Sequence, residues 1–151
     1  SMKLDNFILE AQEFDLRPFL GDEFYLDLLN DHPNFQKYND LFNGSAYNHN
    51  GKLYAHNGLR AVLIYYAYAR YLSNSNINST AFGMVRKEAS ESALISGKEL
   101  SRLVGQAEKG AEIYRDRVYD FLKRNSENYP LFECGKQKNQ RKGGYKITAI
   151  G

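Results

Sequence analysis

Residues 57–73 form the longest stretch of the chain in which apolar side chains recur on nearly every side of a helix. One side of this helix carries Leu59, Val62, Leu63, Tyr66 and Ala67. Most of the remaining surface is covered by Ala61, Ile64, Tyr65, Tyr68 and Leu72. The pattern predicts a central hydrophobic helix that is covered mostly within one subunit, with Arg60 and Arg70 at its exposed margins. A bilayer takes about 20 apolar residues to cross, so this short, charged segment is not expected to span one, and we predict no membrane among the partners.

Single apolar stripes predict further helices before this segment. Residues 4–14 and 18–30 each carry one, and Asp15 to Pro18 is expected to end the first helix, because proline is tolerated in a first turn. A shorter helix follows over residues 34–43. Each of these helices offers one apolar face, which is enough to cover part of the central helix.

The longest stripe runs over residues 97–125 and predicts a long C-terminal helix. Ser96 and Glu99 have the spacing of a capping box at its start. Gly105 and Gly110 lie inside it, where each glycine costs about 0.8–1 kcal/mol relative to alanine. Their presence predicts either a close approach of another group to the backbone or a bend in the helix.

A β-hairpin is predicted over residues 45–56, because Asn50-Gly51 between two short strands is a strong signal for a two-residue turn. The implied pairs are His49 with Lys52, Asn48 with Leu53 and Tyr47 with Tyr54. An isolated hairpin is marginally stable, so this one is expected to lean on the helices or on a neighbouring subunit.

The connection between the two longest helices fits no regular period. Residues 73–80 are polar and predict a loop, and residues 81–96 predict an extended excursion anchored by Phe82, Met84 and Val85. The fold class is therefore mainly α, a bundle of about five helices around the central helix, with a small β-hairpin. We expect residues 1–130 to form a single helical domain and residues 131–151 a basic, flexible C-terminal tail.

Charge is distributed unevenly along the chain. Five cations and one carboxylate give residues 133–151 a net charge of +4, which leaves −2 for the rest of a chain whose net charge is +2. Any charge-driven contact is therefore expected to use the tail. The twelve tyrosines, without any tryptophan, predict half-buried aromatic side chains, either as core rims or as partner contacts. Cys134 is the one cysteine, which favours a reducing compartment.

No residue pattern points to catalysis. His32, His49 and His56 lie in or beside predicted turns, without the spacing of a zinc site, and no histidine is near Cys134 in the sequence. None of the Gly-Lys pairs has the flanking residues of a phosphate-binding loop. We therefore predict no catalytic, metal or cofactor site and a protein that is not an enzyme.

Several segments resemble the small helical head–tail connector, or adaptor, proteins of tailed bacteriophages and prophages. They are Glu10 to Tyr25, Gly58 to Leu72, Phe82 to Lys87 and the long final helix. The similarity includes connectors of phages that infect Bacteroides-type bacteria, among them crAss-like phages. It covers most of the chain up to about residue 125, and no family pattern is matched after Pro130.

The resemblance implies a structural virion protein, assembled in the cytoplasm of a bacterial host and located at the head–tail junction. It implies a ring of about 12 copies whose contacts use two different faces of each subunit. The partners would be the portal protein, a downstream tail or connector protein, and DNA that passes through the lumen.

Two groups of residues are predicted to make these contacts. The subunit or portal contacts lie on the hairpin and the excursion: Tyr47, His49, Lys52, Tyr54, Phe82, Met84, Arg86 and Lys87. The tail contacts are Lys136, Lys138, Arg141, Lys142, Tyr145, Lys146 and Ile147. Residues 145–150 are β-branched enough to add a strand to a partner's sheet edge.

Two alternatives remain open from the residues alone. The basic tail has the composition of an arm that contacts phosphates, which would make this a small helical DNA-binding or regulatory protein. An enzyme of unrecognised type is the other. A tail that serves only solubility would also explain the five cations.

Overall fold

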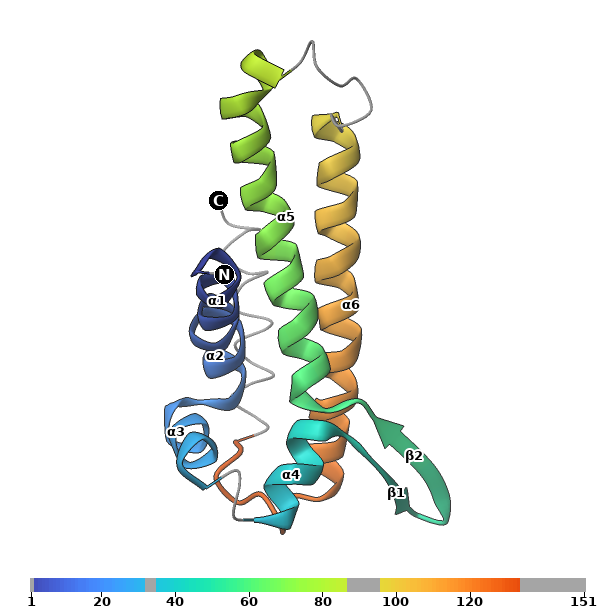
Figure 1. The fold of residues 1–151 in the computed structure, drawn as a ribbon. Helices are drawn as coiled ribbons and strands as arrows, with labels where there is room; N and C mark the ends of the chain where they lie inside the picture. Colours follow the sequence, from blue (N-terminus) through green and yellow to red (C-terminus); the bar gives the residue numbers. More distant parts are fainter. Residues whose placement is uncertain (1, 32–34, 87–95, 134–151) are drawn as a thin grey trace, which may run out of the picture.

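Two long antiparallel helices, α5 (Gly58–Arg86) and α6 (Gly97–Arg124), form the spine of the molecule (Figure 1). This computed structural model describes residues 2–31, 35–86 and 96–133, of which residues 2, 3 and 76–86 are described by their backbone alone. The other elements pack around the end of the spine where α5 begins, and the opposite end of the α5–α6 pair extends beyond them (Figure 1). The expected fold class, mainly α with a small hairpin and a long C-terminal helix, is confirmed.

The N-terminal segment is one continuous rod against α5 and does not end at Pro18 as predicted. It consists of α1 (Met2–Glu10), a π-helical segment, η1 (Ala11–Leu16), and α2 (Arg17–Leu20). In an α-helix the proline ring clashes with the carbonyl four residues before it. Here the wider π turn, closed by the bond from the Arg17 N–H to the Gln12 carbonyl, directly precedes Pro18 and brings it into the first turn of α2.

The rod ends at Gly21, whose φ of 86° separates it from α3 (Asp22–Asp31). The predicted helix over residues 18–30 is therefore divided at Gly21 into α2 and α3. α4 (Gln36–Asn43) follows and ends at Gly44.

The predicted hairpin is confirmed residue by residue. β1 (Ser45–His49) pairs antiparallel with β2 (Lys52–His56), with Tyr47 opposite Tyr54 and His49 opposite Lys52. Asn50 and Gly51 have φ values of 52° and 77°, as a turn with two left-handed residues requires. The hairpin extends sideways from the start of α5 (Figure 1).

α5 is longer than the predicted helix, because it continues to Arg86 through the polar residues expected to form a loop. The prediction of a loop over residues 73–80, and of an extended chain over residues 81–86, is wrong. Serine and asparagine each cost at most about 0.7 kcal/mol in a helix. Ala69 and Leu72, directly before these polar residues, form a second apolar cluster with Leu100 and Ala107 of α6.

α6 matches its predicted bounds and its predicted start. The Ser96 side chain accepts a hydrogen bond from the Glu99 N–H at 3.1 Å. Of the two glycines, Gly110 packs closely, because a Cβ there would lie 2.9 Å from the ring of Tyr65, whereas one at Gly105 would face open space. The expectation of a close approach is therefore confirmed at Gly110.

The main core is rich in aromatic side chains at the end of the molecule that holds α3 and α4. Phe24 contacts the rings of Tyr38, Tyr129 and Phe132 at centroid distances of 6.0–6.2 Å. Tyr129 also donates a hydrogen bond to the Lys37 carbonyl at 2.6 Å. Phe132 is only 6% exposed, so the packed part of the chain extends at least two residues beyond the boundary predicted at residue 130.

α5 is covered on two sides and open on a third. Leu59, Val62 and Ala67 are buried against the surrounding helices. Arg60 is exposed and Arg70 is half-buried, as expected for margins. Ile64 and Tyr68, however, are 56% and 49% exposed, so the expectation that one subunit covers most of this helix holds for only part of it.

Candidate functional site

The base of the hairpin is fixed to the start of α5 by His56, which is 5% exposed. Its Nδ1 accepts a hydrogen bond from the Gly58 N–H at 3.1 Å, so the neutral ring carries its proton on Nε2, 3.2 Å from Ser45 Oγ. The ring stacks on Phe121 of α6 with centroids 4.1 Å apart. Burial lowers the pKa of His56 to about 4, against the small opposing effect of Asp40.

The predicted contact residues of the hairpin divide into two groups. Tyr47 and Tyr54 stack on one another at 5.7 Å and are half-buried against α6. Arg124 holds both, since its guanidinium lies 4.0 Å from the Tyr54 ring centroid and donates a hydrogen bond to the Tyr47 hydroxyl. His49 and Lys52 pair next to the turn, where His49 is half-buried and Lys52 is exposed.

The opposite face of the hairpin contains an exposed residue that the sequence analysis did not select. Leu53 is 70% exposed, the largest fraction among the exposed large apolar side chains of the described residues. Its neighbours on this face, Ala46, Asn48 and Ala55, are exposed and uncharged. The alternation along β2 was the available signal, because it places Leu53 opposite the face that holds Tyr54.

The remaining predicted contact residues are not brought together in the described part of the chain. Phe82, Met84 and Arg86 lie on the last turns of α5, where the backbone alone is described. The following residues lie outside the described residues: Lys87, Lys136, Lys138, Arg141, Lys142, Tyr145, Lys146 and Ile147.

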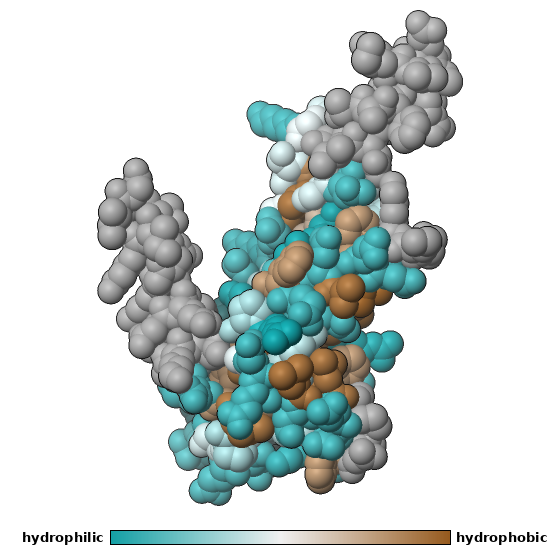
Figure 2. Space-filling model, turned by 90° about the vertical axis from the view of Figure 1, so that its left-hand side faces the viewer, coloured by the Kyte–Doolittle hydropathy of each residue, from teal (hydrophilic) through white to brown (hydrophobic). Residues whose placement is uncertain are grey.

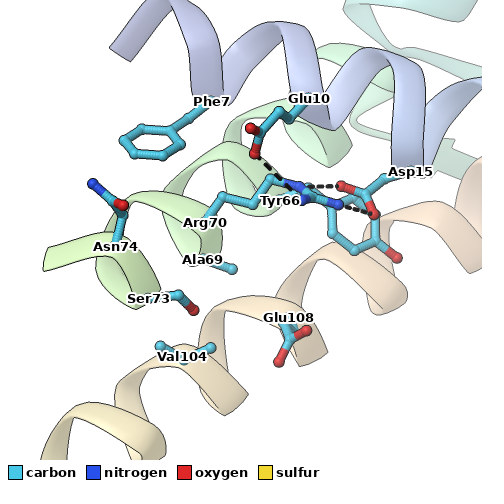
Figure 3. A pocket seen from close by; sticks show the side chains of 10 residues that line it. All are labelled: Phe7, Glu10, Asp15, Tyr66, Ala69, Arg70, Ser73, Asn74, Val104 and Glu108. Atoms are coloured by element: carbon cyan, nitrogen blue, oxygen red, sulfur yellow. Dashed lines mark hydrogen bonds and ion pairs between the residues drawn. The ribbon is translucent and has the colours of Figure 1, made fainter. Parts of the chain in front are cut away.

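A polar pocket with a cavity volume of about 360 Å³ lies between α1, α5 and α6 (Figure 3). Its charged lining consists of Glu10, Asp15 and Glu108, with one cation, Arg70. Among the residues that the structure describes, no three His, Cys, Asp or Glu side chains are placed to hold a metal ion. Arg70 and its partners Glu10 and Asp15 form part of the lining of this pocket.

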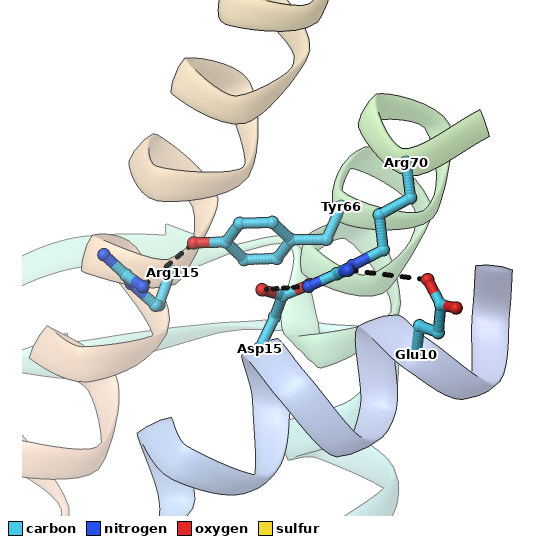
Figure 4. A network of polar contacts seen from close by, with 5 residues as sticks. All are labelled: Glu10, Asp15, Tyr66, Arg70 and Arg115. Atoms are coloured by element: carbon cyan, nitrogen blue, oxygen red, sulfur yellow. Dashed lines mark hydrogen bonds and ion pairs between the residues drawn. The ribbon is translucent and has the colours of Figure 1, made fainter. Parts of the chain in front are cut away.

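Arg70 clamps α5 to the N-terminal rod (Figure 4). Its guanidinium makes two bonds to the Asp15 carboxylate, at 3.0 and 3.1 Å, and a longer one to Glu10 at 3.5 Å. Glu10 and Asp15 are five positions apart, which is about 140° around an α-helix. The π-helical turn between them brings both carboxylates to one side of the rod.

Tyr66 and Arg115 lie beside this clamp and connect it to α6 (Figure 4). Arg115 donates a hydrogen bond to the Tyr66 hydroxyl at 2.9 Å. Burial raises the pKa of Tyr66 to about 12, although the charge of Arg115 acts in the opposite direction. The hydrogen bond to Asp15 is the main cause of the raised pKa of Arg70. Both groups therefore hold one charge state across the physiological pH range, as a structural clamp requires.

Replacing Arg70 with alanine is expected to lower the free energy of unfolding by about 2 kcal/mol, because it leaves Asp15 without its cation. The Asp15 side chain is only 17% exposed. Chemical denaturation of the variant measures the change. The matched control is Arg102→Ala, which breaks an exposed pair with Glu99 and should cost less than about 0.5 kcal/mol. Equal losses in the two variants would contradict a structural role for Arg70.

A row of exposed side chains follows the open side of α5. We call Arg60, Ile64, Tyr68 and Tyr71 the outer stripe; they lie within about 80° around the helix axis at 100° per residue. Ile64, Tyr68 and Tyr71 are 56%, 49% and 46% exposed. Apolar residues all round the helix were the signal in the sequence, but which side lacks cover depends on where the other helices pack.

These features define a mainly α protein built on a long α-hairpin, with a small β-hairpin and uncovered apolar surface. A family profile matches residues 16–142, and the chain belongs to that family, DUF6712, a family of unknown function. No curated protein and no solved structure matches the chain. None of the described helices is both long and apolar enough to cross a membrane.

Proposed function

We propose that this protein is a structural, non-enzymatic head–tail connector subunit of a tailed bacteriophage or prophage. In this role it forms a ring of about 12 copies between the portal and the tail, with DNA in the lumen. The proposal starts from the sequence resemblance of residues 10–25, 58–72 and 82–87 and of the final helix to such connectors.

The observation that carries the proposal is that many large apolar side chains are exposed to solvent. Exposed residues of this kind lie on α1, η1, α3, α5, α6 and the hairpin: Leu4, Ile8, Leu9, Phe14, Leu26, Leu29, Leu53, Ile64, Tyr65, Tyr68, Tyr71 and Ile113. Single exposed apolar residues are common, but groups that share a helix face mark contact surfaces. A ring subunit needs such surfaces on more than one side.

The projecting parts of the fold support the same role. The hairpin and the free end of the α5–α6 pair extend from the body in different directions (Figure 1). The uncharged outer face around Leu53 is free to meet a partner. These are the places where contacts with a neighbouring subunit, the portal or the next tail protein would form.

The test is co-expression with the portal protein encoded in the same genome, followed by electron microscopy of the purified complex. The expected result is a ring of fixed copy number on the portal, and the protein should also be found in purified virions. A protein that stays unattached to the portal and is absent from virions would contradict the proposal.

Removing the tail is expected to weaken attachment to the portal without changing the fold. The deletion should cover residues 134–151, because Tyr129 and Phe132 belong to the core. Thermal unfolding should be unchanged, while the fraction bound to portal falls. A full-length variant with the five tail cations replaced by glutamine separates charge from the proposed strand of residues 145–150. Unimpaired attachment of the truncated protein would show that the tail is not a contact.

The alternative, a DNA-binding or regulatory protein, is favoured by one observation, the net charge of +4 in residues 133–151. In that case the isolated protein should bind DNA with an affinity that falls steeply with salt concentration. The glutamine variant should lose this binding. Binding that survives neutralisation of the tail would exclude the tail as the DNA contact.

A further inference from the structure

The outer stripe of α5 combines apolar surface with positive charge. Its three apolar side chains are each about half exposed, and Arg60 lies at its N-terminal end. From Arg60 to Tyr71 the stripe is about 17 Å long, at 1.5 Å per residue. The sequence of α5 contains no aspartate or glutamate at all. The stripe therefore has no carboxylate of its own helix to pair with Arg60.

α3 combines apolar surface with negative charge. Its sequence contains four acidic residues and no lysine or arginine. Asp22, Glu23, Leu26 and Leu29 are exposed, and we call them the α3 patch; Leu26 and Leu29 are 47% and 55% exposed. Figure 2 shows the side of the molecule that holds α1 to α3, where apolar groups lie among polar ones. At ten residues α3 is about 15 Å long, close to the length of the stripe.

We propose that the outer stripe binds the α3 patch of a second copy of this chain. The inference builds on the proposed ring and identifies the two surfaces that would join its subunits. When the two helices run in the same direction, Ile64 and Tyr68 meet Leu26 and Leu29. Arg60 then lies near Glu23, while Asp22 already pairs with Arg17 at 2.9 Å within its own subunit.

Pairing of two outer stripes is less favourable than this contact. It would bring two copies of a helix that has no carboxylate into contact, so Arg60 would gain no partner. It would also leave the apolar residues of α3 uncovered. Pairing of the outer stripe with the α3 patch brings positive charge to negative charge and buries the apolar side chains of both surfaces.

The two surfaces lie on different parts of the subunit. α3 is at the lower left of Figure 1, beyond the N-terminal rod, and α5 is in the centre. One subunit can therefore use both surfaces at once. A contact of this kind repeats from copy to copy, and it closes into a ring when the rotation between neighbours allows it.

Analytical ultracentrifugation of the full-length protein tests the proposal with three variants. Tyr68→Glu alters the stripe, Leu26→Glu alters the patch, and Ile113→Glu is the matched control. Ile113 is 44% exposed and lies about 200° around α6 from the buried Ala111, outside both surfaces. The first two variants should each weaken self-association on the order of 30-fold, and the control should not. Thermal unfolding checks that all three variants fold.

Mixing the two interface variants decides between the modes of contact. A one-to-one mixture of Tyr68→Glu and Leu26→Glu retains one intact stripe and one intact patch, so it should form dimers and nothing larger. Self-association of Leu26→Glu alone at the wild-type level would overturn the proposal, since it would mean that α3 takes no part. A mixture that stays monomeric, or wild-type protein that shows no association up to its solubility limit, would also overturn it.

Failure of this proposal and failure of the connector function give different results. Stripe-to-patch association without any attachment to the portal would reject the connector role and keep the contact. Attachment to the portal that is unaffected by Tyr68→Glu and Leu26→Glu would reject the contact and keep the role. Loss of attachment in Tyr68→Glu with unchanged self-association would assign the stripe to the portal and overturn the proposed pairing.

Discussion

Replacing Gly44 with alanine is expected to destabilise the protein by about 4 kcal/mol, the largest effect of any substitution considered for this chain. Gly44 joins α4 to β1 and has a φ of 94°, which side chains disfavour. A Cβ at this position would also lie 2.6 Å from the His56 carbonyl oxygen and 3.0 Å from the Asn57 Cα. Because both neighbours are backbone atoms, neither can move aside without shifting the hairpin or the start of α5.

Gly51 provides the matched control for this substitution. Its φ of 77° is similarly unfavourable for alanine, but an added Cβ would meet nothing within 4 Å. Gly51→Ala should therefore cost only about 1 kcal/mol, the cost of the backbone conformation. Urea denaturation of both variants measures the difference. Equal losses would show that conformation alone, and not the close packing of α4, the hairpin and α5, requires glycine at residue 44.

The hairpin and α6 could be predicted from the sequence because local chemistry determines them. Asn50 and Gly51 adopt the left-handed conformations of a two-residue turn, and this turn fixes the whole register of β1 and β2. The start of α6 is determined by the Ser96 side chain, which bonds within three residues. Neither feature depends on how distant parts of the chain pack.

The predictions that failed concern segments where packing overrides local preference. Pro18 and the polar residues after Leu72 both indicate helix ends, yet the rod passes through the first and α5 through the second. A π-helical turn precedes Pro18, and Ala69 and Leu72, just before the polar residues, pack against α6. The π turn depends on a bond between residues five apart instead of four, and the contact of α5 with α6 joins residues far apart in the sequence, so helical spacing and turn-forming residues did not predict either.

The candidate contact surfaces show the same limit. Arg70 pairs with Asp15 across 55 positions of sequence, and this pairing depends on how the rod crosses α5. The pattern of α5 showed that it is apolar all round, but the open arc around Ile64 and Tyr68 is known only once the positions of α1 and α6 are known. Tyr47 and Tyr54 both contact Arg124 of their own subunit, and their contact with a partner stays a prediction.

Lowering the pH from 7 to 4 is expected to remove about 3 kcal/mol of stability through His56 alone. Burial lowers its pKa in the folded protein to about 4, from 6.5 in the unfolded chain. Below pH 6.5 the unfolded state therefore binds a proton that the folded state excludes. The stabilising contribution is complete above pH 6.5 and is lost as the pH falls toward 4. In the neutral ring Nδ1 accepts a hydrogen bond from the Gly58 N–H. In the protonated ring Nδ1 carries a hydrogen and cannot accept this bond.

The variant His56→Phe isolates this effect from the titration of carboxylates. The phenyl ring can keep the stacking contact with Phe121 but cannot accept the bond from Gly58, so the variant should lose about 1–2 kcal/mol at pH 7. Between pH 7 and pH 4 its stability should fall by about 3 kcal/mol less than that of the wild type. His49→Phe, beside the turn of the hairpin, is the matched control for replacing a histidine by phenylalanine. Urea denaturation at several pH values gives the free energy of unfolding of all three proteins as a function of pH. Parallel curves for wild type and His56→Phe would show that His56 has the same pKa in the folded and unfolded states. The stacked, hydrogen-bonded histidine would then not be the group that makes attachment of the hairpin to α5 and α6 sensitive to acid.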